Sequence, residues 1–191
     1  MSPRSKQQFE ELREASIRKI LDASLELFGT TGYENTSIAQ IAKVAGVSKG
    51  LIYNYFESKE AVLKVLIEDL TAIGDQMMAD LFDEDPKQTL KNIFRMIFRW
   101  LRDHEKMNRL IFGMTLHVDR FDFVHELATT KMKGYVELLE QLLQQIGMED
   151  YKTEARILST IFDGIGVQYL VIKEDYPLDE IEEMLIKKYC A

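Results

Sequence analysis

Residues 36–60 read TSIAQIAKVAGVSKGLIYNYFESKE, and this stretch decides the fold of the N-terminal part of the chain. Ser37, with Gln40 three residues later, is typical of a capping box at the start of a helix. Apolar residues follow at helical spacing, and Gly46 supplies the positive φ that ends this helix. Ser48 then caps a second short helix. Two short helices joined by a glycine-containing turn predict a helix-turn-helix unit.

The second helix of such a unit fits the major groove of DNA, and its first residues reach base edges. Lys49 is a donor suited to guanine O6 and N7, and Gly50 lets the backbone approach closely. We expect Tyr55, Lys59 and the free amides of the helix beginning at Ser58 to hold phosphates. The predicted DNA-contacting residues are Thr36, Ser37, Ser48, Lys49, Gly50, Leu51, Tyr53, Asn54, Tyr55 and Lys59.

Several of these residues also have a structural interpretation. A helical hairpin that never touches DNA follows the same sequence of cap, turn and cap. Lys49 and Lys59 fit solvated surface charges. Tyr53 either contacts DNA or packs in the core, and Asn54 faces either solvent or a phosphate.

The charge distribution permits a nucleic-acid partner although the chain has a net charge of −8. Residues 1–58 hold seven Lys or Arg and seven Asp or Glu, so residues 59–191 carry the whole negative charge. A DNA-binding head needs only a locally basic face, while an acidic body stays away from the polyanion. The single cysteine, Cys190, forms no internal disulfide. With no run of 18 apolar residues and no signal peptide, we expect no membrane span and a cytoplasmic location.

Helical periodicity extends over almost the whole sequence, and it predicts an all-α fold. Ten glycines and three prolines interrupt it, and there is no strand-like alternation of useful length. We expect a three-helix head at residues 1–58 and a helical effector-binding and dimerisation domain at 59–191. Further helices are predicted at 59–82, 87–104, 106–116, 121–146, 152–174 and 178–189.

The segment GYENTSIAQIAKVAGVSKGLIYNYFESKEAVL closely resembles the DNA-binding signature of TetR-family transcriptional regulators. The resemblance covers roughly residues 16–63, and Leu51 departs from it, because a small or polar residue is common there. The matching positions are Gly32-Tyr33, Thr36, Ile41-Ala42, Ala45-Gly46-Val47-Ser48, Gly50, Tyr53, Tyr55-Phe56 and Ser58-Lys59-Glu60. The resemblance implies a homodimer with paired recognition helices and an effector pocket within the C-terminal helices.

From these observations we expect a repressor that leaves a palindromic operator when a small molecule binds. The amphipathic segments 121–146 and 152–174 suit a four-helix seam between two subunits, although they also fit an internal core. The segment 94–121 is rich in bulky residues that line a pocket or fill a core. The ligand-binding candidates are Phe98, Phe112, Met114, His117, Phe162 and Asp163, the last of which also fits a solvent-facing position.

Catalytic and metal chemistry find little support in the sequence. The stretch HVDRFDFVHE at 117–126 contains residue types that bind transition metals, but its spacing matches no closed site. There is no nucleophile paired with a base and no glycine loop that cradles phosphate, so we expect no enzyme and no cofactor. A DNA-binding protein that answers to a protein partner, or to nothing, stays open as an alternative.

Overall fold

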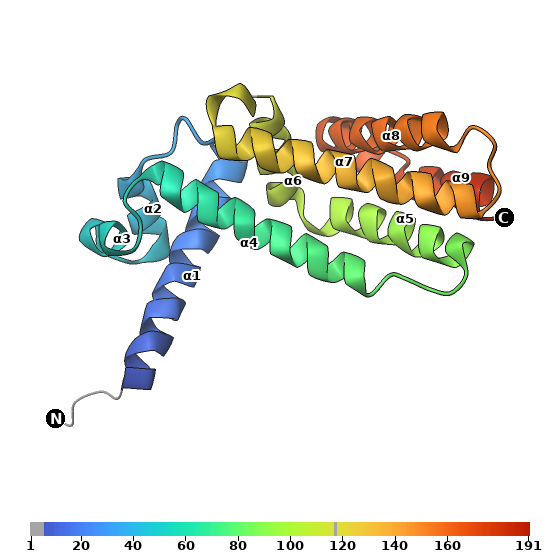
Figure 1. The fold of residues 1–191 in the computed structure, drawn as a ribbon. Coiled ribbons are helices and arrows are strands. Elements are labelled where there is room, and N and C mark those ends of the chain that lie inside the picture. Colours follow the sequence, from blue (N-terminus) through green and yellow to red (C-terminus); the bar gives the residue numbers. More distant parts are fainter. Residues whose placement is uncertain (1–5, 117) are drawn as a thin grey trace. The chain divides into compact units, whose positions relative to one another are not determined.

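The computed structural model describes residues 6–116 and 118–191, which contain helices and no strand (Figure 1). The predicted all-α class is confirmed, and the observed bounds lie close to those expected from spacing and caps. The α-helices are α1 (Lys6–Thr30), α2 (Ile38–Ala45), α3 (Lys49–Tyr55), α4 (Lys59–Ala79), α5 (Pro86–Asp103), α6 (Glu105–Thr115), α7 (Asp122–Gln145), α8 (Tyr151–Ile172) and α9 (Leu178–Cys190). The 3-10 helices are η1 (Val118–Arg120) and η2 (Lys173–Asp175).

The contacts within the chain divide it into two compact units between Thr71 and Ala72. This division falls later than the one expected after residue 58, because the first turns of α4 contribute to the core of the N-terminal unit. An ion pair between Arg18 of α1 and Asp69 of α4, at 2.9 Å, lies in the same unit. The buried apolar side chains of this unit include Ile20, Leu21, Phe28, Ile41, Ile52, Phe56, Val62, Leu63, Leu66 and Leu70.

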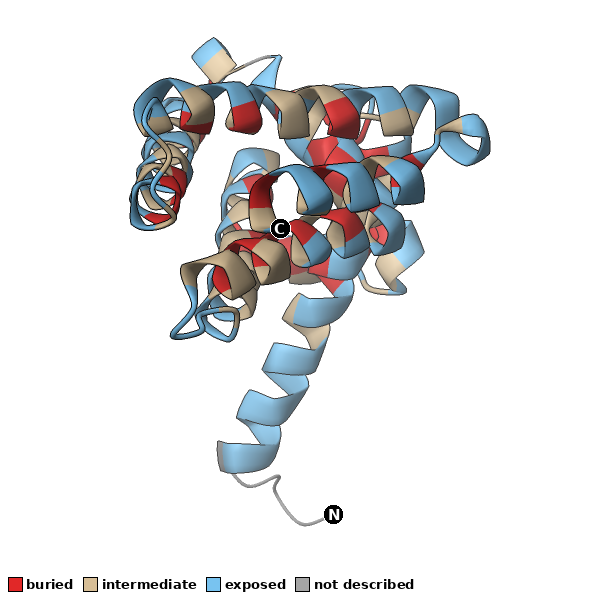
Figure 2. Ribbon diagram, turned by 90° about the vertical axis from the view of Figure 1, so that its right-hand side faces the viewer, coloured by how far each residue is buried: buried red, intermediate tan, exposed pale blue. Residues whose placement is uncertain are grey.

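The C-terminal unit is a helical bundle in which α5 is the central element. This helix packs against α9, α7 and α6, and α7 packs in turn against α8. Buried and exposed residues alternate along these helices at helical spacing, so each helix turns one face to the core (Figure 2). The core is made of Leu90, Ile93, Phe94, Phe98, Leu101, Leu139, Leu142, Leu143, Ala155, Leu158, Ile165, Leu178, Leu185 and Tyr189.

A polar contact ties the end of α9 to the start of α8. The buried Tyr189 donates its hydroxyl hydrogen to the Glu154 carboxylate, and the Lys188 ammonium lies 3.3 Å from the same carboxylate. The hydrogen bond from Tyr189 holds the pKa of Glu154 below its usual value. Since η2 joins the end of α8 to the start of α9, and the end of α9 meets the start of α8, the two helices run in opposite directions.

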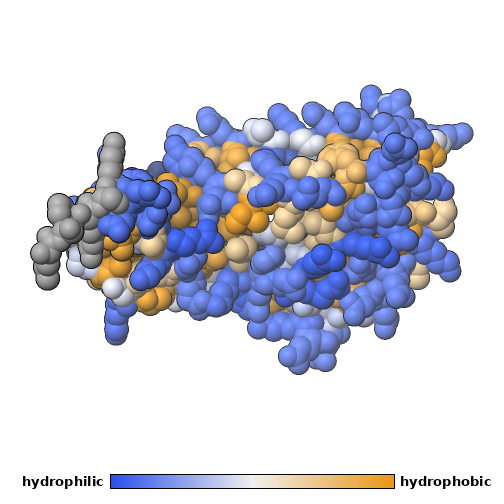
Figure 3. Space-filling model, turned by 90° about the horizontal axis from the view of Figure 1, so that it is seen from below, coloured by the Kyte–Doolittle hydropathy of each residue, from blue (hydrophilic) through white to orange (hydrophobic). Residues whose placement is uncertain are grey.

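The outward side of α8 is unusually apolar for a surface. Four large apolar side chains on it are exposed, namely Ile157, Val167, Val171 and Ile172. On the face of the molecule drawn in Figure 3, by contrast, hydrophilic side chains predominate and apolar ones form separate patches. Among the described residues, Tyr151–Asp175 is long and apolar enough to cross a membrane by length and composition alone. One such helix is weak evidence, since a core helix passes the same test.

Gly166 allows α8 to approach α5 and α6 closely. A Cβ atom built at Gly166 would lie 2.6 Å from Cζ of Phe112 and 3.4 Å from Cδ2 of Leu101. Both neighbours belong to packed helices, and Leu101 is buried in the core. The bundle at this point therefore depends on the absence of a side chain.

We expect Gly166→Ala to destabilise the protein by about 1–3 kcal/mol, because the added methyl group overpacks the contact with the Phe112 ring. Gly113→Ala is the matched control, since a Cβ there meets nothing within 4 Å. The control should keep or slightly raise the stability, because alanine favours a helix by up to about 1 kcal/mol over glycine. Urea denaturation of the two variants measures the difference. Equal midpoints would show that the close approach carries no constraint.

Candidate DNA-binding surface

The turn between α2 and α3 is built around Gly46, which adopts the left-handed conformation with φ 67° and ψ 31°. The N–H of Val47 donates to the carbonyl oxygen of Ala42 at 3.0 Å and closes the end of α2. A Cβ at Gly46 would meet nothing within 4 Å, so the requirement for glycine is conformational and not steric. This residue sets the direction in which α3 leaves α2.

Both helices of the unit begin with serine caps. At α2 the Ser37 N–H donates to Oε1 of Gln40 at 2.7 Å, and the Gln40 N–H donates to Oγ of Ser37 at 3.3 Å. The predicted capping box is thus present. At α3 the Leu51 N–H donates to Oγ of Ser48 at 3.1 Å. The Ser37 hydroxyl also donates its hydrogen to Oε1 of Gln40, so it is engaged within the cap. The Ser48 hydroxyl accepts from Leu51, which leaves its hydrogen for an acceptor such as a phosphate.

The outward face of α3 presents most of the residues predicted to contact DNA. Ile52 is completely buried, whereas Lys49, Gly50, Tyr53 and Asn54 are exposed. Tyr53 is 49% exposed, which excludes the alternative that it packs in the core. Leu51 is half-buried. The ammonium of Lys49 lies 5.8 Å from the centroid of the Tyr53 ring, so both side chains lie at the same end of the face.

Tyr55, at the last turn of α3, is half-buried and meets a residue that sequence reasoning missed. The guanidinium carbon of Arg13 in α1 lies 5.8 Å from the centroid of the Tyr55 ring. Arg13 is exposed and also donates to Glu10 at 2.9 Å. Because the contact joins two helices far apart in the chain, no local pattern indicated it. It adds a cation beside the predicted contact surface.

Two predicted DNA contacts are corrected by the structure. Thr36 is only 2% exposed, and its hydroxyl donates inward to the Gly32 carbonyl at 2.8 Å. The Lys59 ammonium donates to the carbonyl oxygens of Tyr33 at 2.7 Å and Thr36 at 2.9 Å, and it lies 4.0 Å from the centroid of the Tyr33 ring. Both side chains therefore fasten the loop between α1 and α2, and neither is directed at a phosphate.

The aromatic ligand-binding candidates pack against one another in the core. The Phe94 and Phe162 ring centroids lie 5.2 Å apart, and those of Phe98 and Phe162 lie 6.3 Å apart, both edge to face. Phe112 packs against Gly166, and Met114 is 8% exposed. These four candidates fill space between helices, which is the core interpretation of the aromatic-rich segment.

The remaining two candidates differ in how far they are described. Asp163 is exposed on α8, and partial desolvation raises the pKa of its carboxyl group. His117 lies outside the described residues. Among the residues that the structure describes, no group of three or more His, Cys, Asp or Glu is placed to hold a metal ion.

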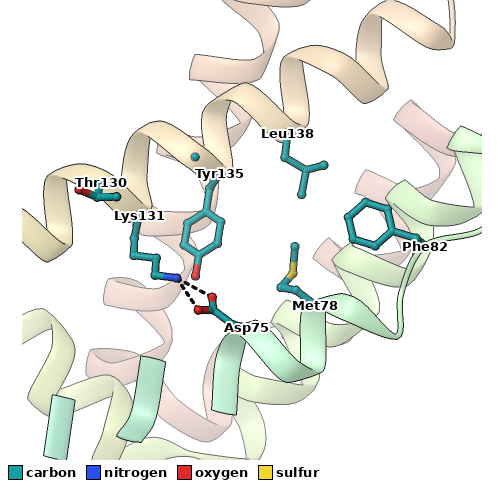
Figure 4. A pocket seen from close by; sticks show the side chains of 8 residues that line it. Asp75, Met78, Phe82, Thr130, Lys131, Tyr135 and Leu138 are labelled. Atoms are coloured by element: carbon teal, nitrogen blue, oxygen red, sulfur yellow. Dashed lines mark hydrogen bonds and ion pairs between the residues drawn. The ribbon is translucent and has the colours of Figure 1, made fainter. Parts of the chain in front are cut away.

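A groove that no sequence pattern indicated lies between the last turns of α4 and the middle of α7 (Figure 4). Its volume is about 350 Å³, within the range of small-molecule sites. All of its lining residues belong to the C-terminal unit: Asp75, Met78, Phe82, Thr130, Lys131, Gly134, Tyr135 and Leu138. Lys131 and Asp75 form an ion pair across it.

Comparison with known proteins agrees with this geometry. The family described as "Bacterial regulatory proteins, tetR family" matches residues 20–66. The regulator BetI of Pseudomonas aeruginosa is 27% identical over 173 residues, which cover 85% of each chain. A TetR transcription regulator from Haloarcula marismortui shares the fold with a TM-score of 0.78, at 16% identity over 92% of this chain and 96% of its own. NalD, a repressor of an efflux pump in Pseudomonas aeruginosa, has a TM-score of 0.73 at 22% identity over 94% of this chain and 95% of its own.

The capped turn, the buried Ile52 and the outward face of α3 define a helix-turn-helix DNA-binding protein. The family match spans this head, and the relative and the shared fold extend the likeness over the C-terminal helices. Residues 20–66 carry the DNA-binding domain of the tetR family of bacterial regulatory proteins, and the chain as a whole is similar to the regulator BetI. Members of this family are regulators and not enzymes.

We expect Lys59→Met to weaken the N-terminal unit by about 1–3 kcal/mol, because two loop carbonyls lose a charged donor. Hydrogen exchange at residues 31–37, together with urea denaturation, measures the loss. Lys64→Met is the matched control, since Lys64 is an exposed lysine on the same helix. A phosphate contact would behave differently: it would leave stability unchanged and lower the salt slope of DNA binding by about one unit. That second pattern would contradict the structural role.

Proposed function

We propose that the chain is a homodimeric repressor that binds a palindromic DNA operator through α3 and leaves it when a small molecule binds. The observation that carries the proposal is the exposed N-terminal end of α3, where Lys49 and Gly50 are exposed while Ile52 anchors the helix in the core. Such an end fits the major groove and reads base edges. NalD, which shares the fold, is itself described as a repressor. A regulator of this kind acts in the cytoplasm, where it meets its DNA operator.

The contact set that we propose is narrower than the one expected from sequence. Lys49 and Tyr53 read bases, and the closeness of their side chains lets one groove segment receive both. Ser48, Asn54 and Tyr55 hold phosphates from the two ends of α3. Arg13 joins this group because its guanidinium lies beside the Tyr55 ring. Thr36 and Lys59 support the loop instead.

Dimerisation follows from the size of the head, since a helix of seven residues makes few contacts by itself. Two heads about one DNA turn apart, roughly 34 Å, read a palindrome together. The exposed apolar side of α8 supplies the seam, and Gly164 on that side lets two helices approach closely. On α7 the exposed Met132 and Tyr135 are accompanied by exposed polar side chains, namely Lys133, Glu137 and Gln141.

We therefore place the seam on α8 and α9, and not on α7 and α8 as expected from sequence. Met184 of α9 is 66% exposed. It lies one turn before Lys188, whose ammonium reaches Glu154 of α8, so Met184 is on the side of α9 that borders α8. The apolar side chains of both helices then form one continuous face for a second copy of the chain.

Release by a small molecule requires a link between the effector site and the head, and α4 is that link. This helix begins at Lys59 in the N-terminal unit and ends at Ala79 in the C-terminal unit. A shift of its last turns changes the spacing of two heads. A coupling free energy of about 1–3 kcal/mol would change operator affinity roughly 5- to 150-fold, which is enough for a switch.

We expect Gly50→Ala to lower DNA affinity about tenfold without lowering stability, because the methyl group blocks the approach of the backbone to the bases. In the free protein the added Cβ would meet only Oγ of Ser48, at 3.9 Å, which is ordinary contact. Alanine should even stabilise α3 by up to about 1 kcal/mol. Fluorescence anisotropy with the duplex that the wild-type protein selects from a random pool measures affinity, and thermal unfolding measures stability.

The same assay tests Lys49→Ala, for which we expect a loss of about 5- to 150-fold and a weaker base preference at one position. Lys133→Ala is the matched control, because Lys133 is an exposed lysine of the C-terminal unit. If Gly50→Ala and Lys49→Ala both bind like this control, α3 does not enter the groove and the proposal is wrong.

We expect Val171→Glu to convert the dimer to a monomer at micromolar concentration, because it buries a charge in the α8 seam. Val171 is 76% exposed in the single chain, so the fold of the monomer should survive. Leu116→Glu, at an apolar side chain next to α6 that is 82% exposed, is the matched control and should stay dimeric. Sedimentation velocity distinguishes the two masses. A dimeric Val171→Glu protein would place the interface elsewhere.

A further inference from the structure

The groove between α4 and α7 has a polar end and an apolar end. Figure 4 shows the Lys131 ammonium, the Asp75 carboxylate and the Tyr135 hydroxyl gathered at one end. Met78 of α4 and Leu138 of α7 lie toward the other end. Phe82, which follows α4, adds a ring that is 58% exposed. Such a shape fits a small amphiphile, with its charged group at the ion pair and its apolar part along the methionine, leucine and phenylalanine.

The ion pair at the polar end is asymmetric in its exposure. The Lys131 ammonium lies 2.5 and 2.7 Å from the two carboxylate oxygens of Asp75. The Lys131 side chain is 29% exposed, whereas the Asp75 side chain is 53% exposed. Asp75 can therefore turn into water at small cost, and the less exposed Lys131 then presents its charge to an anion in the groove.

Both charged or polar side chains that remain here, Lys131 and Tyr135, can donate a hydrogen bond, and the Lys131 ammonium cannot accept one. Tyr135 is 45% exposed, and partial desolvation raises the pKa of its hydroxyl, so this hydroxyl keeps its hydrogen at neutral pH. Once Asp75 has turned away, the Lys131 ammonium and the Tyr135 hydroxyl face the groove without an acceptor. A carboxylate accepts from both donors, whereas an amine would compete with Lys131 for the single carboxylate of Asp75. The chemistry at this end thus favours an anionic ligand.

We propose that the groove binds a small organic carboxylate with an apolar tail, and that the ligand takes the place of Asp75 on Lys131. Two hydrogen bonds hold its carboxylate, and Met78, Leu138 and Phe82 cover its tail. The proposal names the effector class for the proposed function and rests on that function for its regulatory consequence. Binding itself does not depend on it.

The regulatory consequence follows from where the displaced residue lies. Asp75 belongs to the last turns of α4, and its pairing with Lys131 fastens α4 to α7. A ligand that takes Lys131 removes this fastening and places its tail between the two helices. The end of α4 is then free to shift. Because α4 starts in the N-terminal unit, the shift reaches the heads along one continuous helix.

Titration calorimetry of the full-length protein with octanoate tests the binding, with octylamine and octanol as chain-matched probes. We expect octanoate to bind and the other two probes to bind at least about tenfold more weakly. Lys131→Met should lower the affinity for octanoate about tenfold or more, because a charge-assisted hydrogen bond is lost. Asp75→Asn should raise this affinity about two- to fivefold, since it removes the competing carboxylate.

The Asp75→Asn result separates the two signs of ligand charge. A cation would lose its partner in this variant and bind more weakly, so weaker octanoate binding by Asp75→Asn, or stronger binding of octylamine than of octanoate, would overturn the proposal. Absence of octanoate binding at millimolar concentration would overturn it as well. Asp179→Asn is the matched control, because it removes one carboxylate from the surface ion pair with Arg102 and should leave octanoate affinity unchanged.

A second measurement keeps this proposal distinct from the proposed function. The duplex selected by the wild-type protein is titrated with protein in the presence and absence of octanoate. Octanoate should weaken DNA binding of the wild type at least about fivefold and leave that of Lys131→Met unchanged. If octanoate binds but DNA affinity stays constant, the groove does not regulate the heads and the coupling is overturned. If no duplex is selected at all, the proposed function fails, while the calorimetry still decides the carboxylate site.

Discussion

The left-handed backbone at Gly46 is the constraint on which the head depends. It turns the chain so sharply that α2 and α3 bury Ile41 and Ile52 completely in one core. Because Ile52 of this seven-residue helix points into the core, Gly50 and Asn54, two positions to either side of it, lie on the opposite face. Lys49 and Tyr53, four residues apart, share one side of the helix next to that face, and both are exposed. A residue with a Cβ at position 46 would oppose the turn, and the outward face would lose its fixed direction.

The parts of the head that could be predicted from sequence are those determined within one turn of helix. Ser37 with Gln40, Ser48 and Gly46 act on backbone atoms three or four residues away, so their pattern is visible in the sequence. Lys59 was misjudged because its acceptors include the Tyr33 carbonyl, 26 residues earlier. A lysine in a predicted DNA-binding motif has the same local pattern whether it meets a phosphate or a carbonyl.

The C-terminal unit shows the same limit more strongly. Apolar spacing predicted its helices well, because each helix turns one face to the core. The spacing of apolar residues does not indicate which helices are neighbours. The aromatic segment 94–121 was therefore compatible with both a ligand pocket and a packed core. The groove could not be predicted for the same reason, because Lys131 and Asp75, which pair across it, are 56 residues apart in the sequence. Likewise, α8 is apolar on two sides, and only its packing on α7 showed which side is left open.

The two ends of α4 differ in how firmly they are fastened, and this difference bears on how a ligand acts. At its start Lys59 makes two short hydrogen bonds to loop carbonyls and lies over the Tyr33 ring. Near its end Asp75 makes one ion pair and is half-exposed to water, and such pairs contribute only about 0–1 kcal/mol. In the proposed mechanism, a ligand at Lys131 therefore needs little binding energy to release the end of α4 near Asp75, while the start of α4 stays held by Lys59. Under this proposal a shift of α4 would move the head, because the ion pair of Asp75 breaks more easily than the two hydrogen bonds of Lys59.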